Sequence, residues 1–473
     1  MITKTTIVAT VGPATASEQM IQALIDRRVT VFRLNFSHGD FASHQQTLDR
    51  IRRLSKTAAW AVCVMGDLCG PKIRAATIAP EGRLEIDEQV IIRADSEQGT
   101  PHSFGITAPQ LVSDIKIGER ILIDDGTIRL VVADKEADRL ICTVQVGGTI
   151  STGKGVNLPD TDLNLPAITE RDWEYVRWAI DNDLDYLALS FVQRAEEIFT
   201  LRKTLTEANS PIRVVAKIEK PAAVKHIASI LHASDALLVA RGDLGVEMDL
   251  AHVPAAQKQM TALGRRFGKP VIVATQVLQS MIHNPVPTRA EVSDVANAVM
   301  DYADAVMLSG ETAVGDWPIQ AVEFLAHACR VTERSLDTSE APRPTIETLP
   351  ELHDREAVTR AVAMMLDRLN ARLIVAWTVS GQVARLLSKA RPDVPILALC
   401  PDARVARQLA FYYGVLSVHA AAPRDMAAWL GQVEALCLDN GWAARGDDIL
   451  LLPPEGLLSP HSRWAIMMHT IAG

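Results

Sequence analysis

Short apolar runs alternate with stretches whose apolar positions recur at helical spacing over much of the chain. This alternation predicts parallel strands that are buried on both faces and joined by helices. The first three runs are joined in this way, with helical spacing over 15–28 and 39–56 between them. Eight such runs occur before residue 340: Thr6–Val11, Thr30–Asn35, Ala59–Met65, Asp185–Phe191, Val214–Ile218, Ala236–Ala240, Val271–Thr275 and Ala305–Leu308. Eight strand–helix units in this length favour a closed (β/α)8 barrel over an open doubly wound sheet.

The period changes between Gly70 and Pro166. Apolar and polar residues alternate there in short runs, which are separated by turn pairs such as Asp-Gly and Gly-Gly. This spacing predicts hairpins and a small all-β module. We expect the module to be an insertion in a loop of the barrel, where added chain is well tolerated.

A third part follows a proline- and threonine-rich stretch at 338–350, which is typical of a linker. Glu351–Leu369 has helical spacing, and the runs Arg372–Thr378, Ile396–Cys400 and Asp448–Leu452 predict buried strands of a smaller α/β domain. The predicted domains are therefore a barrel at 1–68 and 168–340, a β insert at 69–167 and a C-terminal α/β domain at 341–473.

Composition supports a large folded protein and excludes several classes of function. The 473 residues are 48% hydrophobic and 22% charged, which suits about three domains. The net charge is −9 and no long basic run occurs, so neither a nucleic acid nor a membrane surface is an expected partner. The six cysteines form no CxxC pair, and the chain shows no signal peptide and no apolar run long enough to span a membrane. We therefore expect free thiols and a cytoplasmic location.

Polar residues stand at the ends of two neighbouring predicted strands. Lys217 and Glu219 close the run Val214–Ile218, and Asp243 follows the run Ala236–Ala240. Ligands bind at this end of parallel strands. Two carboxylates suit Mg²⁺, and a lysine beside them can stabilise developing negative charge. A purely structural ion pair of Lys217 with Glu219 or Asp243 explains the same residues equally well when they are taken alone.

The other strand ends add residues of related chemistry. They are Arg33, Asn35, Ser37 and His38 after the second strand, Asp67, Lys72 and Arg74 after the third, Thr275 after the seventh, and Ser309, Gly310 and Glu311 after the eighth. Each of these residues, taken singly, suits an ordinary structural role such as a helix cap or a surface charge. Gathered at one mouth, the cations and acids suit phosphoryl transfer on an acidic substrate.

The motifs resemble those of pyruvate kinases, in order along most of the chain. The most specific are VAKIEK, ARGDLGVE and MLSGETAVG, and they are joined by TTIVATVGPAT, RLNFSHG, GPKIR, KGVNLP, ATQVLQSM and PTRAEVSDVANAV. The resemblance implies a TIM barrel with an inserted small β-barrel domain and a C-terminal α/β domain. It also implies transfer of the phosphoryl group of phosphoenolpyruvate to ADP, which yields pyruvate and ATP in the last step of glycolysis, and a homotetramer.

The resemblance assigns roles to the residues at the mouth. Glu219 and Asp243 would hold Mg²⁺ or Mn²⁺, and Lys217 would stabilise the transferring phosphoryl group and the enolate. Arg33 would contact the phosphoryl group, and Thr275 would orient the proton relay. The backbone at Gly242 and Asp243, followed by a helix start, would bind the substrate carboxylate. Ser309 and Glu311 join the catalytic set at the same rim.

The nucleotide would be held by residues of the barrel and of the insert. The resemblance implies contacts from Asn35, His38, Arg74 and Lys154. Lys154 belongs to the insert, so the insert would close over the phosphates as a lid and exclude water.

The chain departs from the family at a monovalent-cation site. The resemblance places that site at Asn35, Ser37, Asp67 and the carbonyl of Leu68. Relatives that need potassium carry glutamate where this chain has Lys72. We predict that the Lys72 ammonium replaces the potassium ion and that potassium is not required. The alternative is that Lys72 points to solvent.

The C-terminal domain carries a second departure. Its loop TVSGQVAR keeps Thr378, Ser380 and Gly381 of the family's effector loop, but Gln382 and Val383 replace an arginine and a hydroxyl residue. We therefore expect weak activation by fructose 1,6-bisphosphate, with a sugar monophosphate effector left open. Two other functions also stay open from sequence: a barrel lyase or aldolase acting through a magnesium enolate, and a binding protein with an inactive barrel.

Overall fold

Eight parallel strands form a closed barrel at the centre of the protein. The computed structural model describes residues 2–95, 97–161, 166–336, 353–366, 368–459, 461 and 464–472, without the side chains of residues 353 and 355. The strands follow the order β1-β16-β15-β14-β13-β12-β3-β2 around the barrel. Their bounds are β1 Thr6–Val11, β2 Val31–Asn35, β3 Cys63–Asp67, β12 Tyr186–Leu189, β13 Arg213–Ile218, β14 Ala236–Ala240, β15 Val271–Ala274 and β16 Ala305–Leu308.

Each of the eight predicted apolar runs overlaps one barrel strand, so the predicted barrel is confirmed. The third strand was predicted in the wrong place, because Ala59–Met65 was expected and β3 spans Cys63–Asp67. The residues before it pack against the C-terminal domain instead, where the Ala61 N–H donates to the Ser417 carbonyl. The apolar run therefore begins before the strand, because the C-terminal domain buries the first residues of the run.

Helices surround the barrel and their starts are capped as the sequence indicates. Asp40 caps α2, within the stretch from residue 39 where helical spacing was expected, and Thr169 and Thr288 cap α3 and α9. The helices of this domain are α1 Glu18–Asp26, α2 Phe41–Leu54, α3 Glu170–Asp181, α4 Ala195–Glu207, α5 Pro221–Lys225, α6 Ile227–Ala233, α7 Arg241–Glu247, α8 Val253–Arg266, α9 Arg289–Met300, α10 Gly310–Ala313 and α11 Pro318–Ser335, with 3-10 turns η1 Ser55–Thr57, η3 Leu250–His252 and η4 Gln279–Ile282.

The insert between β3 and α3 is all-β, as predicted, and is called the lid below. Its hydrogen bonds form a six-stranded sheet, β11-β7-β8-β9-β5-β6, and a two-stranded sheet, β10-β4. The Asp-Gly hairpin joins β7 to β8, and Asp124, Asp125 and Gly126 all have positive φ there. The lid elements are β4 Gly82–Leu84, β5 Gln89–Arg93, β6 Ser103–Gly105, η2 Pro109–Ser113, β7 Arg120–Ile123, β8 Ile128–Lys135, β9 Arg139–Val146, β10 Gly148–Ile150 and β11 Val156–Asn157.

The C-terminal domain is a five-stranded sheet in the order β19-β18-β17-β20-β21. The three predicted strands are present, but β19 and the antiparallel edge strand β21 were not predicted. The predicted linker at 338–350 and the first two residues of the predicted helix Glu351–Leu369 lie outside the described residues. The elements are α12 His353–Leu366, β17 Ile374–Trp377, α13 Gln382–Lys389, β18 Ile396–Cys400, α14 Ala403–Gln408, η6 Leu409–Phe411, β19 Val415–His419, α15 Met426–Asp439, β20 Asp448–Leu452, η7 Glu455–Leu457 and β21 Met467–Thr470.

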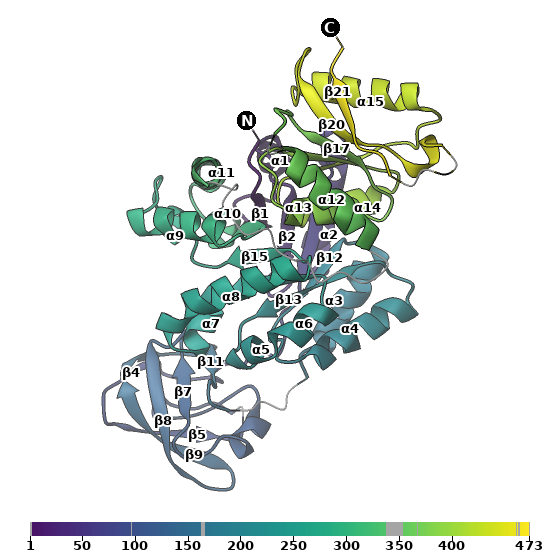
Figure 1. The fold of residues 1–473 in the computed structure, drawn as a ribbon. Helices are drawn as coiled ribbons and strands as arrows, with labels where there is room; N and C mark the ends of the chain where they lie inside the picture. Colours follow the sequence, from purple (N-terminus) through teal and green to yellow (C-terminus); the bar gives the residue numbers. More distant parts are fainter. Residues whose placement is uncertain are drawn as a thin grey trace.

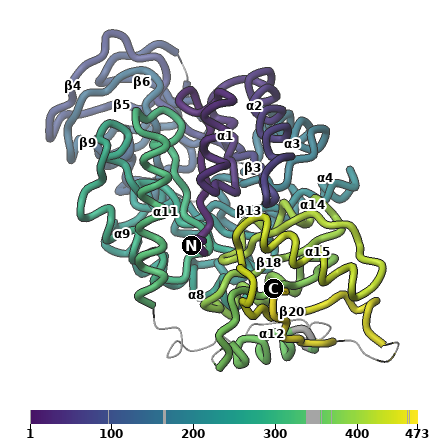
Figure 2. Tube along the Cα trace, turned by 90° about the horizontal axis from the view of Figure 1, so that it is seen from above, coloured from purple at the N-terminus to yellow at the C-terminus, as the bar shows by residue number. Residues whose placement is uncertain are grey.

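The lid and the C-terminal domain lie at opposite ends of the barrel (Figure 1), and the view turned by 90° agrees (Figure 2). Phe411 of the C-terminal domain belongs to the apolar cluster inside the barrel, and its ring meets that of Tyr186 at 4.7 Å in a T-shaped contact. The amino-terminal end of the barrel is therefore closed by the C-terminal domain, which leaves the other end, beneath the lid, for a substrate.

Candidate active site

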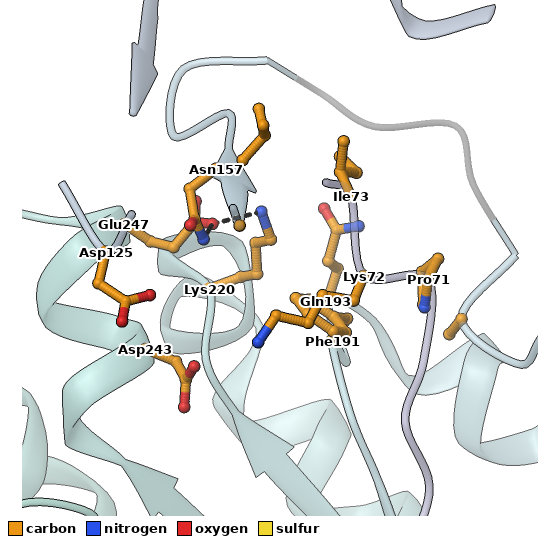
Figure 3. A pocket seen from close by; sticks show the side chains of 13 residues that line it. Pro71, Lys72, Ile73, Asp125, Asn157, Phe191, Gln193, Lys220, Asp243 and Glu247 are labelled. Carbon is orange, nitrogen blue, oxygen red and sulfur yellow. Dashed lines mark hydrogen bonds and ion pairs between the residues drawn. The ribbon is translucent and has the colours of Figure 1, made fainter. Parts of the chain in front are cut away.

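The polar residues predicted from the strand ends gather where the barrel mouth faces the lid. A cleft there is lined by lid residues including Lys72, Asp125 and Asn157 and by barrel residues including Asp243 and Lys220 (Figure 3). Parallel strands of one barrel all end on this side, so each contributes the residue that follows it. The site therefore lies between two domains.

Lys217 is the centre of a buried ionic network at this mouth. Its Nζ lies 2.7 Å from Glu219 Oε1 and 3.2 Å from Asp67 Oδ1, and it donates to Ser190 Oγ at 2.6 Å. The side chains of Lys217, Asp67 and Glu219 are at most 11% exposed. A lysine this deeply buried needs partners, and this one has two carboxylates and a hydroxyl.

The charges of the network shift one another's pKa values. Burial works against the Lys217 ammonium, but the carboxylates of Asp67 and Glu219 raise its pKa overall. Burial also works against the Asp67 carboxylate, yet Lys217 and Arg33 keep its pKa below the usual range. Lys217 is therefore a fixed positive charge at neutral pH, which suits electrostatic stabilisation and not proton exchange.

Arg33 is held in place beside this network. Its Nε donates to Asp67 Oδ2 at 2.6 Å, and its Nη1 donates to Thr10 Oγ1 at 3.1 Å. Asp67 thus links Arg33 and Lys217, because each cation contacts one oxygen of its carboxylate. The pair is arranged to receive an anion from the cleft side.

Glu219 and Asp243 come from neighbouring strand ends and fit a divalent cation. Burial raises the pKa of Glu219, and the charge of Asp243 raises it further, against the opposing effect of Lys217. A divalent cation between the two carboxylates would remove that repulsion. Within the described part of the chain no cluster of three or more His, Cys, Asp or Glu side chains forms a complete cage, so further oxygens would come from substrate and water. Mg²⁺ binds in this way in phosphoryl-transfer sites.

Thr275 adopts a left-handed backbone conformation directly after β15, with φ of +66°. Its Oγ1 accepts from the Gly242 N–H at 2.7 Å and donates to the Ala274 carbonyl at 2.6 Å. A β-branched residue disfavours positive φ, so the fold holds this hydroxyl at some cost in strain. The hydroxyl is thereby fixed beside the first turn of α7, which carries Asp243.

Glu311 and Ser309 act on the loop that follows Thr275. The Glu311 carboxylate is 1% exposed and accepts from the Leu278 N–H at 3.0 Å and from the Ser309 N–H at 2.8 Å. It therefore joins the loop after β15 to the end of β16. The structure gives Glu311 a positioning role, while Ser309 contributes its backbone.

The residues of the expected monovalent site lie near the network but are already hydrogen-bonded. Asn35 Oδ1 accepts from the Ser37 N–H at 3.2 Å, and the Leu68 carbonyl accepts from Ser190 Oγ at 2.7 Å. The same Ser190 hydroxyl accepts from Lys217, so the Leu68 carbonyl is connected to the ammonium. Lys72 is exposed and lines the cleft, and Figure 3 shows its side chain pointing into the cleft.

The expected nucleotide residues divide between the two domains. Arg74 lies where the lid begins, and its Nη1 donates to the Gly153 carbonyl at 2.9 Å. Lys154 is paired with Asp124 at 2.9 Å within the lid, and His38 is exposed on the barrel side. Arg74 and Lys154 each contact a residue of the lid in this structure. For Lys154 to contact a nucleotide, its ion pair with Asp124 would have to break.

Sequence reasoning missed a second group that joins lid to barrel. Glu247 Oε1 accepts from Lys220 Nζ at 2.8 Å and from Asn157 Nδ2 at 2.7 Å, as the dashed lines in Figure 3 mark. Lys220 directly follows Glu219, and this position after a strand could have marked it. Asn157 and Glu247 lie in the motifs KGVNLP and ARGDLGVE, but neither follows a predicted barrel strand directly, so neither was singled out. Ser190 directly follows β12, so it could also have been recognised as a strand-end residue.

The loop TVSGQVAR of the C-terminal domain leads from β17 into α13. Thr378 is buried after β17, Ser380 is exposed, and Gly381 caps α13 with φ of +81°. The positive φ explains the glycine.

Comparison with known proteins agrees with this geometry. Residues 2–322 match the family model of the pyruvate kinase barrel domain, and residues 356–453 match that of the pyruvate kinase alpha/beta domain. A pyruvate kinase of Mycobacterium intracellulare is 40% identical over 448 residues, covering 94% of each chain. One from Staphylococcus aureus is 40% identical over 452 residues, which cover 95% of this chain and 77% of that protein.

A solved structure shares the whole architecture. The crystal structure of a pyruvate kinase from Cryptosporidium parvum superposes with a TM-score of 0.90 at 33% identity, covering 99% of this chain and 96% of that one. Over the described residues, none of the helices combines the length and the apolar content that a membrane crossing needs. With the barrel, its charged mouth and both domain matches in agreement, this chain belongs to the pyruvate kinase family.

Proposed function

We propose that this protein transfers the phosphoryl group of phosphoenolpyruvate to ADP, giving pyruvate and ATP. The observation that carries the proposal is the Lys217 ammonium, held 2.7 Å from Glu219 and adjoining Asp67 and Arg33 at the barrel mouth. That arrangement places two fixed cations where a phosphoryl group and an enolate oxygen would both carry negative charge.

In this mechanism Arg33 and Lys217 bind the phosphoryl group from the barrel side. The bond between the phosphorus and the enol oxygen breaks, and a bond to the terminal phosphate oxygen of ADP forms. Lys217 stays protonated and stabilises the enolate oxygen that is left. A magnesium ion held by Glu219 and Asp243 would supply further positive charge to the same oxygens.

Binding of the substrate carboxylate is assigned to the first turn of α7. The Gly242 N–H already donates to Thr275, so the following N–H groups of this turn are the donors that remain for the carboxylate. Thr275 would then lie beside the methylene carbon of the enolate. Its hydroxyl, or a water bound to it, would pass the proton that converts the enolate to pyruvate.

A coupled assay tests the proposal directly. Phosphoenolpyruvate, ADP and Mg²⁺ are supplied, and pyruvate is reported by lactate dehydrogenase. We expect steady turnover that requires both ADP and the divalent ion. Pyruvate release without ADP would indicate a lyase or hydrolase, and no pyruvate from correctly folded protein would indicate an inactive barrel.

We further propose that activity does not require potassium, because Lys72 supplies a charge at the mouth. Lys72 lines the same cleft as Asp243, and Figure 3 shows its side chain reaching into that cleft. Replacing potassium by tetramethylammonium should therefore leave turnover nearly unchanged.

The Lys72→Glu variant should then depend on added potassium. Lys116→Glu, which makes the same charge change at an exposed lid residue outside the cleft, serves as the control. A many-fold loss of turnover of the unaltered protein in tetramethylammonium would refute the proposal.

A further inference from the structure

Two neighbouring residues directly after β15 adopt a left-handed backbone conformation, Thr275 with φ of +66° and Gln276 with φ of +51°. Neither residue is a glycine, and a β-branched threonine is especially disfavoured in this region. Such a conformation persists only where the surrounding structure imposes it. The contacts that impose it here therefore determine where the Thr275 hydroxyl lies.

The Arg241 guanidinium supplies such contacts from the neighbouring strand end. Arg241 directly follows β14, and its Nη2 donates to the Thr275 carbonyl at 3.0 Å and to the Gln276 carbonyl at 3.4 Å. Successive carbonyls of an extended strand point in opposite directions, so one donor can reach two of them only where the backbone turns. The guanidinium therefore stabilises the left-handed form of the loop and not an extended continuation of β15.

Arg241 is itself held in a fixed position. Its Nη1 lies 2.6 Å from Asp294 Oδ2, and it donates to Asp294 Oδ1 at 2.7 Å and to Gln257 Oε1 at 3.5 Å. Asp294 belongs to α9 and Gln257 to α8, so two outer helices anchor the guanidinium. The Arg241 side chain is only 11% exposed, and a charge this well buried is costly to separate from its partners.

The residue after Arg241 binds the other end of Thr275. The Gly242 N–H donates to Thr275 Oγ1 at 2.7 Å. This N–H lies in the first turn of α7, where no intrahelical acceptor is available, so the hydroxyl is its partner. A Cβ at Gly242 would lie 3.3 Å from the same hydroxyl oxygen, which leaves little room for a side chain. Arg241 and Gly242 thus bind the carbonyl and the hydroxyl of a single residue.

We propose that Arg241 is a positioning residue for the proton transfer that completes the reaction. The inference rests on the proposed function, in which Thr275 or a water bound to it gives a proton to the methylene carbon. In that step an O–H bond breaks, a C–H bond forms, and the oxygen recovers a proton from water. Arg241 does not touch the substrate, because it is not among the described residues that line the cleft, and its Nη1 and Nη2 already serve Asp294 and the two carbonyls.

A double-mutant cycle in the coupled assay tests whether Arg241 acts through Thr275. Arg241→Gln, Thr275→Ala and the double variant are compared with the unaltered protein. Arg202→Gln is the matched control, since Arg202 is likewise bound to an aspartate and a backbone carbonyl, Asp235 and Ala233, but at the start of β14. Arg241→Lys keeps the charge without the planar fork of donors, and thermal unfolding establishes that all variants are folded.

We expect kcat of Arg241→Gln to fall by about tenfold or more, because the hydroxyl is no longer held in place. The KM for phosphoenolpyruvate should stay within about twofold, since the substrate contacts remain. Arg241→Lys should keep part of the lost kcat, and Arg202→Gln should match the unaltered protein. In the Thr275→Ala background, Arg241→Gln should lower kcat by no more than about twofold, because the group that it positions is already absent.

Amide hydrogen exchange tests the same contact without turnover. The Gly242 amide is followed by mass spectrometry in the peptide that contains it. Its exchange should accelerate by about tenfold in Arg241→Gln, where Thr275 is held less firmly, and stay unchanged in Arg202→Gln.

Three results would overturn the proposal: an unchanged kcat in Arg241→Gln, an equal loss of kcat with and without the Thr275 hydroxyl, or unchanged exchange at Gly242. An unaltered protein that forms no pyruvate would instead overturn the proposed function. Hydrogen exchange would still decide in that case whether Arg241 holds Thr275, so the two failures are distinguishable.

Discussion

Four ionised side chains, Arg33, Asp67, Lys217 and Glu219, form one buried cluster at the barrel mouth, with side-chain exposure of 1–11%. Two are cations and two are anions, so the cluster is neutral in itself. Burying isolated charges costs several kcal/mol each, and pairing them at hydrogen-bond distance offsets most of that cost. The cluster is therefore folded and charged before a substrate arrives, and no reorganisation is needed when negative charge develops.

Removing the Lys217 ammonium should affect both catalysis and stability. In Lys217→Met, kcat should fall by about 10²–10³-fold, because a fixed charge that stabilises the enolate is lost. The thermal midpoint should also fall, because Asp67 and Glu219 are left with less compensating charge.

The coupled assay and thermal unfolding measure the two effects separately. Lys225→Met, in the neighbouring helix α5, removes the same charge outside the network and should change neither quantity substantially. If Lys217→Met kept more than a third of the original kcat, Lys217 would not have the proposed role.

Glu311 should influence the reaction through Thr275 without touching the substrate. Glu311→Gln puts an amide NH₂ opposite an N–H donor at Leu278 or Ser309, so the loop after β15 loses one of its two attachments. We expect kcat to fall by roughly tenfold with little change in KM for phosphoenolpyruvate, since about 1.4 kcal/mol of positioning is lost.

Glu323→Gln is the matched control, because Glu323 is an exposed residue whose partner is Arg27 on the outside of the barrel. Glu311→Asp keeps the charge and should restore part of the lost kcat. An unchanged kcat in Glu311→Gln would show that the loop is held by other contacts.

Helix α7 connects the lid to the side of the site where the proposed magnesium ligands lie. Asp243 is in its first turn and Glu247 is its last residue, and Glu247 accepts hydrogen bonds from Asn157 of β11 and from Lys220. The second oxygen of Glu247 is buried without a hydrogen-bond partner among the described residues. A short helix thus fixes both a proposed magnesium ligand and the lid strand above it.

Breaking the contact between lid and helix should weaken nucleotide binding. In Asn157→Leu, the lid loses its hydrogen bond to Glu247, so its closed position is less populated and the KM for ADP should rise several-fold. The KM for phosphoenolpyruvate should change less, because its proposed ligands lie on the barrel.

Gln145→Leu alters an exposed amide elsewhere on the lid and should leave both constants unchanged. An equal rise in both KM values for Asn157→Leu would contradict a role in lid position. Steady-state kinetics with each substrate varied in turn distinguishes the two outcomes.

At the scale of the whole molecule, the two ends of the barrel have different surroundings. The mouth faces the lid and carries the charged cluster, while the opposite end is closed by the C-terminal domain through Phe411 and through buried ion pairs such as Asp304 with Lys389 at 2.7 Å. The cleft at the mouth, beneath the lid, is therefore the end of the barrel that remains open to a ligand.

The buried thiols make stability depend on pH above neutrality. Burial raises the pKa of Cys142 to about 12 and that of Cys400 to about 12, whereas an unfolded cysteine titrates near 8.5. The unfolded state therefore loses protons first, so the stability these thiols contribute is complete below about pH 8.5 and is lost as the pH rises towards their folded pKa values.

The thermal midpoint, measured in reducing buffer from pH 7.5 to 10.5, should thus decline. The Cys142→Ala/Cys400→Ala variant should start from a lower midpoint, because cavities form, and should decline less steeply with pH. Cys69→Ala, at a half-exposed position, is the control and should keep the original slope. Equal slopes in all three proteins would exclude Cys142 and Cys400 as the cause.

Local spacing was enough to place the eight barrel strands, the all-β insert and the residues Lys217, Glu219, Asp243 and Thr275 at strand ends. A strand buried on both faces and a helix with one apolar face each leave a period in the sequence, and parallel strands bring their ends to one side. The same reasoning placed β3 four residues early and missed β19 and β21, because burial by another domain and pairing at a sheet edge have no period of their own.

Only the tertiary structure determines which of these residues contact one another. No spacing in the sequence shows that Asp67 lies against both Arg33 and Lys217, that Ser190 bridges Lys217 to the Leu68 carbonyl, or that Glu247 holds Asn157 of the lid. Nor does it show that arginines from residues 28, 330 and 372 meet in one cavity. Such contacts join residues tens to hundreds of positions apart, so they depend on the three-dimensional path of the backbone, whereas the periods that reveal strands and helices arise from neighbours along it.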